Sequence, residues 1–169
     1  MIAISVTVDG AAVAAHVSPR YLLSDFLRER AAVAGVHVAC GHGVCGACTV
    51  AVDGVATRAC LMLAVQADGA AVQSVASLPE LEGCIPPQSP PPSAKEAEAA
   101  RLTPLQRAFR DHHALQCGYC TPGLLVSTAL FLAQNKTPSR GAILDHLNGH
   151  ICRCTGYANI IAAIESVRP

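Results

Sequence analysis

The sequence has little charge, and neither sign is in excess. Lysine and arginine together number 12, aspartate and glutamate also number 12, and the four types make up only 14% of the 169 residues. No basic field is available to recruit nucleic acid, and no acidic field is available to steer a basic partner. A chain with so few charges and 51% hydrophobic residues is typical of one that covers part of its surface with permanent partners.

Long apolar runs are also missing. The sequence has no stretch of about twenty consecutive apolar residues, which argues against a membrane span. The N-terminus lacks the basic start and apolar run of a signal peptide, so we expect a cytoplasmic protein, and its nine cysteines point to metal binding rather than to disulfides. No phosphate-binding glycine motif is present, and no nucleophile pattern accompanies His112 and His113. We therefore expect no substrate site on this chain.

Four of the nine cysteines form a first group around a glycine-rich stretch. Cys40, Cys45 and Cys48 have the spacing Cys-x4-Cys-x2-Cys, and Cys60 follows after eleven further residues. This is the plant-type spacing for a [2Fe-2S] cluster. Glycines between the cysteines permit the positive φ angles and close approach that a loop around an inorganic core requires. The sequence therefore predicts one cluster on these four thiols.

Two other metal sites fit this first group less well. A structural zinc site uses two short cysteine pairs, whereas Cys60 stands by itself after a strand-like segment. His42 follows Cys40 by two residues, as in a Rieske centre, but that centre needs a second cysteine and histidine pair at the same spacing, which the sequence lacks. We therefore expect His42 not to be a ligand.

Four more cysteines form a second group. Cys117 and Cys120 make one close pair, Cys152 and Cys154 make another, and 31 residues separate the pairs. Each pair precedes a predicted helix, whose free N–H groups and dipole stabilise an anion. The thiols are therefore expected to converge on a second [2Fe-2S] cluster, although two close pairs are also a common zinc pattern.

The hydrophobic pattern of residues 1–77 predicts a small α+β domain of the β-grasp, ferredoxin-like type. Turn signals at Asp9-Gly10 and Asp53-Gly54 predict two hairpins. A helix is expected from Ser18-Pro19 to about residue 32, crossing the first hairpin. The expected strands are Ile2–Val8, Ala11–Val17, Thr49–Val52, Val55–Arg58 and about 71–75.

The rest of the chain is expected to be a linker followed by helices. Residues 78–101 contain the proline-rich run Pro86–Pro92 and are predicted to be a linker; Cys84, also there, is interpreted as a spare thiol. Residues 102–169 are predicted to form a four-helix domain. Its helices are expected at about 103–113 and 121–134, between Thr137-Pro138 and Asn148-Gly149, and from Thr155 to about 167.

The combination of motifs resembles the iron-sulfur subunit of the xanthine oxidase family of molybdenum hydroxylases. The motifs are the first cysteine group, then the run Gln116–Gly123, then the run Cys152–Tyr157. The resemblance covers essentially the whole chain and is to the small subunit of heterotrimers of the carbon monoxide dehydrogenase type. It implies an electron-transfer subunit of an oxidoreductase, with a molybdopterin-type molybdenum cofactor on a large subunit and FAD on a medium subunit, assembled as a dimer of heterotrimers.

The same resemblance implies roles for individual residues. The cluster of the helical domain, on Cys117, Cys120, Cys152 and Cys154, would lie nearest the molybdopterin and accept electrons first. The cluster on the first cysteine group would pass them on to FAD. Gln116 matches a family glutamine that approaches the pterin, and His150 stands where relatives usually have asparagine. The alternatives are a free-standing two-cluster electron carrier, which would need a charged docking face, and a zinc-stabilised interaction module.

Overall fold

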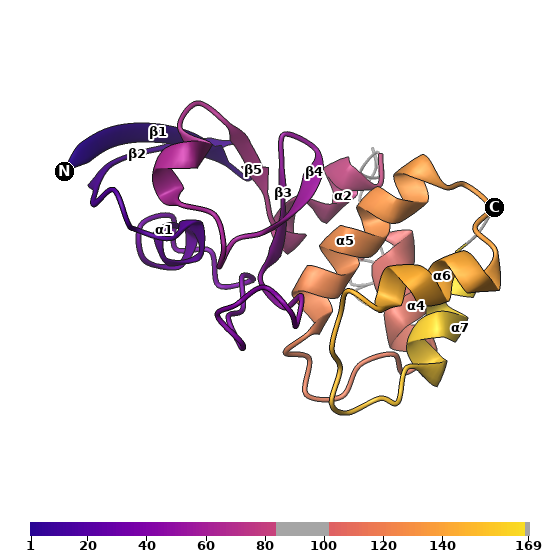
Figure 1. Ribbon diagram of the computed structural model, residues 1–169. Coiled ribbons are helices and arrows are strands. Elements are labelled where there is room, and N and C mark those ends of the chain that lie inside the picture. Colours follow the sequence, from indigo (N-terminus) through magenta and orange to yellow (C-terminus); the bar gives the residue numbers. More distant parts are fainter. Residues whose placement is uncertain (84–101, 168–169) are drawn as a thin grey trace, which may run out of the picture.

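The computed structural model describes residues 1–83 and 102–167 and has the predicted α+β architecture. Figure 1 shows a β-sheet with one helix on one side of the molecule and a group of helices on the other. The predicted linker run Pro86–Pro92 and Cys84 lie outside the described residues. The domain limits at 77 and 102 therefore stay a prediction.

The sheet has five strands in the order β2-β1-β5-β3-β4. Strand β1 runs parallel to β5, and the other neighbouring strands are antiparallel. Both predicted hairpins are present, and their turns have two successive residues with positive φ, which is the conformation that aspartate followed by glycine favours. The strands are β1 (Ile2–Val8), β2 (Ala11–Val17), β3 (Thr49–Val52), β4 (Val55–Arg58) and β5 (Ala71–Gln73).

One helix, α1 (Leu23–Glu29), packs on this sheet and closes the first core. Its Leu23, Phe26 and Leu27 side chains are fully buried, and the burial of each stabilises the fold by about 1.5–3 kcal/mol. The prediction that this helix begins at Ser18-Pro19 was wrong. The backbone N–H of Tyr21 donates to the carbonyl of Ser18 at 2.9 Å and closes a turn, and Leu22 then forms a β-bridge with Leu63, so the helix begins after that bridge.

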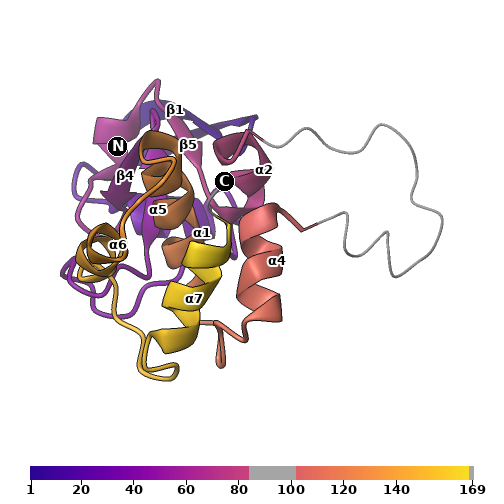
Figure 2. The same ribbon diagram turned by 90° about the vertical axis from the view of Figure 1, so that its right-hand side faces the viewer.

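The second part of the chain forms four helices, as predicted, and a short fifth helix joins them. The four are α4 (Pro104–Asp111), α5 (Thr121–Gln134), α6 (Arg140–Leu147) and α7 (Ala158–Ser166). The short helix α2 (Leu78–Leu81) follows two 3-10 turns, η1 (Ala64–Ala67) and η2 (Val75–Ser77), and packs against α5 (Figure 2). Fully buried side chains from α2, α4, α5, α6 and α7 share one core, to which Leu78, Phe109, Leu124, Ile143 and Ile160 belong.

Two of these helices begin later than predicted. Helix α6 begins at Arg140 and not at Thr137-Pro138, because the Ser139 hydroxyl accepts a hydrogen bond from the Ala142 N–H at 3.2 Å and caps the helix there. Helix α7 begins at Ala158, because Gly156 and Tyr157 have φ angles of 65° and 68° and turn the chain just before it. The second shift moves the start of α7 away from Cys152 and Cys154.

Helix α5 connects the two parts of the fold. It contacts β3 and β4 of the sheet as well as α2 and α4 of the helical group. Its residues from Gly123 to Ala129 are all buried, which explains why its sequence is apolar on every side. Among the described residues, no helix is both long enough and apolar enough to cross a membrane.

His146 on α6 makes the fold sensitive to acid. Its ring stacks on Phe131 with centroids 4.4 Å apart, and its Nε2 lies 3.4 Å from the hydroxyls of Ser127 and Thr128. Burial, with a smaller contribution from the charge of Arg58, lowers the pKa of His146 from 6.5 to about 4. The unfolded chain therefore binds this proton more readily than the folded chain, and stability is lost as the pH falls from about 6.5 towards 4.

We expect the free energy of unfolding to fall by about 1 kcal/mol through His146 between pH 8 and pH 5.5, after allowance for solvent screening. Urea denaturation at the two pH values measures the change. The variant His146→Gln should lose less stability over this interval than the unmodified chain, whereas His16→Gln, at an exposed position on β2, should behave like the unmodified chain. Equal losses in all three proteins would contradict the assignment.

Candidate metal centres

The first cysteine group lies on the loop between α1 and β3 and at the end of β4. Gly41, Gly43 and Gly46 have φ angles of 68°, 82° and 77°, which confirms that the loop needs glycine to turn between its cysteines. Cys48 comes directly before β3 and Cys60 lies two residues after β4, so the β3–β4 hairpin returns the chain to the loop. The carbonyl of Cys48 accepts a hydrogen bond of 3.2 Å from the N–H of Ala59.

The thiols of this first site approach one another in two pairs. Cys40 is in hydrogen-bonding contact with Cys45, whose backbone N lies 3.5 Å from the Cys40 sulfur. Cys48 and Cys60 form the other pair, and both are buried. His42 does not join them, because its Nδ1 hydrogen-bonds the carbonyl oxygen of Cys40 at 2.7 Å.

The thiols of the second site also approach in two pairs. Each pair joins a cysteine that precedes α5 in the sequence with a cysteine that follows α6. The sulfurs of Cys117 and Cys154 are 3.6 Å apart, and Cys120 and Cys152 lie close enough that each affects the pKa of the other. Cys120 is the N-cap of α5, so this cysteine pair directly precedes a helix, as the sequence predicted. The expectation that Cys152 and Cys154 directly precede a helix was wrong, because four residues of a turned loop separate Cys152 from Tyr157, the N-cap of α7.

Side chains of this loop, and not a helix end, hold the Cys152 region in place. The Thr155 hydroxyl donates to the Cys152 sulfur at 3.1 Å. The Tyr157 hydroxyl accepts from the Cys152 N–H at 2.8 Å and donates to the His150 carbonyl at 3.0 Å. The residues that make these contacts lie in the run from Cys152 to Tyr157. Sequence reasoning gave the hydroxyls of Thr155 and Tyr157 no role at the metal site.

The four thiols of the second site line a pocket of about 220 Å³. Gln116 lines the same pocket and is exposed, as are Cys117 and Cys154, whereas Cys152 is buried. Cys45 of the first site also lines it. The structure therefore brings together every predicted cysteine of this site, places Gln116 beside them and sets the two sites next to each other.

The local environment divides the thiols into those that ionise readily and those that do not. Hydrogen bonds from backbone N–H groups, first that of Cys45 and then that of His42, lower the pKa of Cys40 to about 6. Burial raises the pKa of Cys48 to about 11 and that of Cys120 to about 12. Because metals bind the thiolate, the buried cysteines need a strongly bound cation to hold them in that form.

The donor set fits an iron-sulfur cluster better than a single metal ion. Every member is a cysteine sulfur, and each site consists of two pairs. Each iron of a [2Fe-2S] cluster is bound by two cysteine thiolates, whereas zinc gathers its four ligands around one ion. This arrangement favours two irons at each site.

The two cysteine loops touch each other directly. The backbone N–H of Ile151, next to Cys152, donates to the carbonyl of Cys45 at 2.9 Å. The Tyr119 ring stacks on His37 with centroids 4.6 Å apart, and its hydroxyl donates to the Val38 carbonyl at 2.8 Å. Sequence reasoning missed this interface, because the groups that form it are largely backbone carbonyls and N–H groups that every sequence contains.

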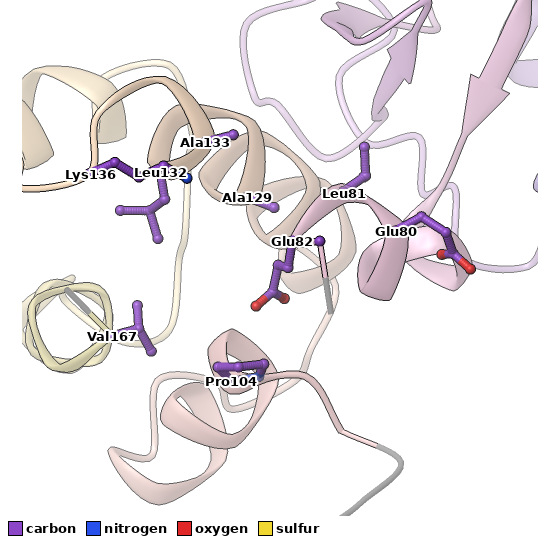
Figure 3. Close-up of a pocket in the computed structure, with 10 residues that line it drawn as sticks. Glu80, Leu81, Glu82, Pro104, Ala129, Leu132, Ala133, Lys136 and Val167 are labelled. Carbon is purple, nitrogen blue, oxygen red and sulfur yellow. The ribbon is translucent and has the colours of Figure 1, made fainter. Parts of the chain in front are cut away.

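A larger hollow of about 480 Å³ lies between α2, α4 and α5, and no cysteine is found among the described residues that line it (Figure 3). The Glu82 carboxyl points into it. One oxygen of Glu82 accepts from the Leu105 N–H at 3.2 Å, and the other has no hydrogen-bond partner within the described part of the chain. Burial raises the pKa of Glu82. This hollow does not contribute to either metal site.

Gly123 lets the first turn of α5 lie close to the first cysteine loop. A Cβ atom at this position would lie 2.4 Å from the carbonyl oxygen of Gly46 and 2.7 Å from that of Ala47. We expect Gly123→Ala to push α5 away from the first cysteine loop and to destabilise the protein by about 1–3 kcal/mol. A lower thermal unfolding midpoint measures this effect.

The matched control for this variant is Gly141→Ala on α6. There the nearest atom to a new Cβ would be the Ser139 hydroxyl oxygen at 3.8 Å, so no clash arises. Alanine is also a better helix former than glycine by about 1 kcal/mol, so this control should keep or raise the unfolding midpoint. If both variants leave the midpoint unchanged, the close approach at Gly123 does not constrain the fold.

Two domain families match the chain, one over each part of the fold. Residues 6–73 match the family described as "2Fe-2S iron-sulfur cluster binding domain". Residues 93–165 match the family described as "[2Fe-2S] binding domain". The first match covers most of the sheet and the first cysteine group, and the second match covers the second cysteine group.

Relatives and solved structures match over nearly the full length. The chain is 45% identical to "Caffeine dehydrogenase subunit gamma" of Pseudomonas sp. (strain CBB1), over 98% of this chain and 90% of that protein. It is 40% identical to "Nicotine 6-hydroxylase small subunit" of Paenarthrobacter nicotinovorans, over 95% and 86%. A chain of quinoline 2-oxidoreductase from Pseudomonas putida 86 matches with a TM-score of 0.82 and 40% identity, over 99% and 92%. The chain therefore belongs to the iron-sulfur small subunits of the xanthine oxidase family of dehydrogenases and hydroxylases.

Proposed function

We propose that this chain relays electrons, one at a time, between a molybdenum cofactor on a large subunit and FAD on a medium subunit. The observation that carries this function is that eight thiols come together as four pairs at two sites whose loops touch. The matches to two [2Fe-2S] domain families support it. We also propose domains at 1–77 and 102–169 joined by a linker at 78–101; the first match lies within the first of these domains, and the second begins at residue 93, inside the proposed linker.

The ligands we propose are the eight cysteines of the two sites. The first cluster would be held by Cys40, Cys45, Cys48 and Cys60, and the second by Cys117, Cys120, Cys152 and Cys154. When bound, each cluster accepts and releases single electrons. The protein contributes donors to the sulfurs, such as the Thr155 hydroxyl and the Cys45 N–H, and these favour the more negative, reduced form.

We further propose that electrons enter at the second site and leave from the first. Cys117, Cys154 and Gln116 are exposed, which supports an approach of the molybdenum cofactor from this side with Gln116 contacting its pterin. The hydrogen bond from the Ile151 N–H to the Cys45 carbonyl connects the two sites. Ile151 is covalently joined to Cys152 of the second site, and Cys45 belongs to the first site, so the connection is short. Apolar side chains of Leu115, Tyr119 and Ile151 are 40–50% exposed beside the second site, as expected for a surface that a partner covers.

The names of the relatives support a multi-subunit enzyme over a free-standing carrier. One is called a gamma subunit and another a small subunit. We propose an assembly in the cytoplasm, as a dimer of heterotrimers with a large and a medium subunit. Caffeine, nicotine and quinoline in the names of three relatives are N-heterocycles. We therefore propose that the large subunit oxidises an N-heterocyclic compound, with no substrate site on this chain.

The ligand set is tested by counting iron in the purified complex. We expect about four irons and four acid-labile sulfides per small subunit, with two distinct EPR signals after reduction. Cys117→Ser should remove about half of the iron and one EPR signal, because serine is not ionised at neutral pH and binds iron weakly.

The matched control is Cys84→Ser, which removes the cysteine that belongs to neither proposed site. It should leave both the iron content and the two signals unchanged. Loss of iron in the control, or full iron content in Cys117→Ser, would show that the ligand set is different. A colourless protein that contains zinc would refute the function itself.

A further inference from the structure

Arg58 lies where the two metal sites meet. It is the last residue of β4 and stands two residues before Cys60. Its guanidinium reaches across to the carbonyl of Gly149, which stands three residues before Cys152. One half-buried side chain therefore connects the backbone that leads into a cysteine of the first site with the backbone that leads into a cysteine of the second.

All three guanidinium nitrogens of Arg58 donate hydrogen bonds. The Nε donates to the carbonyl of Gly43, on the first cysteine loop, at 3.3 Å. One terminal nitrogen donates to the Thr49 hydroxyl, and the other donates to the Gly149 carbonyl. Thr49 is itself buried and donates to the Gly46 carbonyl at 2.6 Å. The guanidinium therefore binds the first cysteine loop directly at Gly43 and through Thr49 at Gly46, and it binds the second loop at Gly149.

The surroundings of Arg58 are closely packed, so the guanidinium has a defined place. A Cβ atom on Gly149 would lie 3.2 Å from its terminal nitrogen, and one on Gly46 would lie 2.4 Å from Nδ1 of His150 and 2.7 Å from the Gly149 carbonyl oxygen. Hydrogen bonds that involve a charged group are stronger than neutral ones, and a planar guanidinium can bind several acceptors at fixed angles. Lysine also has three N–H donors, but they radiate from one nitrogen and do not match acceptors spread around a planar guanidinium.

We propose that Arg58 is a positioning residue that fixes the separation of the two iron-sulfur clusters by holding Gly43 of the first cysteine loop to Gly149 of the second. This inference rests on the proposed function, because it requires both clusters. It extends the proposed function by assigning to the Arg58 side chain a role in setting the distance between the two cysteine loops. Without the guanidinium, the Ile151–Cys45 hydrogen bond and the Tyr119 contacts remain, so the two loops stay associated but are held at fewer points.

The test compares Arg58→Gln with the unmodified chain in the complete, fully reduced complex. Spin–spin splitting of the two cluster EPR signals is the main readout, because it depends on the inverse cube of the distance between the clusters and does not depend on turnover. We expect both clusters to be present, the splitting to decrease and the rate of electron transfer between them after pulsed reduction to fall by about tenfold, the factor that corresponds to roughly 1.4 kcal/mol. Arg58→Lys should give a smaller change in the same direction.

The matched control is Arg28→Gln. Arg28 also donates from its guanidinium to a backbone carbonyl, that of Val36 at 2.7 Å, but this bond stays within the first part of the fold. It should leave the splitting and the transfer rate unchanged. Unchanged splitting and rate in Arg58→Gln, with both clusters present, would overturn the proposal while leaving the proposed function intact.

Two further outcomes remain distinguishable. If Arg58→Gln does not assemble, Arg58→Lys is compared with the unmodified chain by the same two readouts, and unchanged values there overturn the proposal. If the unmodified complex lacks two iron-sulfur signals, the proposed function fails, and the role of Arg58 fails with it.

Discussion

The approach of cysteine thiols in pairs is the constraint on which the rest of this structure depends. A [2Fe-2S] cluster needs two thiolates on each iron, and three of the four pairs join cysteines that are far apart in the sequence. The β3–β4 hairpin brings Cys60 back to Cys48, and the helices between Cys120 and Cys152 return the chain to the second site. The hairpin therefore completes the first site, and the helices complete the second.

The second constraint is that the two sites must lie close together for electrons to pass between them. Helix α5 packs on β3, and Gly123 allows its first turn to meet the backbone of the first cysteine loop. The hydrogen bond between Ile151 and Cys45 and the three bonds of Arg58 then join the loops.

Sequence reasoning predicted the elements well where local signals are strong. The two Asp-Gly turns gave both hairpins, and the cysteine spacings gave both groups of thiols that the structure brings together. It failed at the starts of α1, α6 and α7, where a β-bridge, a serine cap and a residue with positive φ decide the boundary. The interface between the loops could not be predicted, because a long-range backbone hydrogen bond and the side chains of Tyr119, His37 and Arg58 form it, and these have no periodic pattern.

The most direct test of paired thiolate ligation is Mössbauer spectroscopy of the complex enriched in ⁵⁷Fe. With the proposed ligation of each iron by two cysteines, all iron of this chain should belong to two spin-coupled pairs when oxidised. On reduction by one electron per pair, each pair should give one ferric and one ferrous site with sulfur coordination. Iron that is uncoupled, or that forms one pair only, would contradict the account.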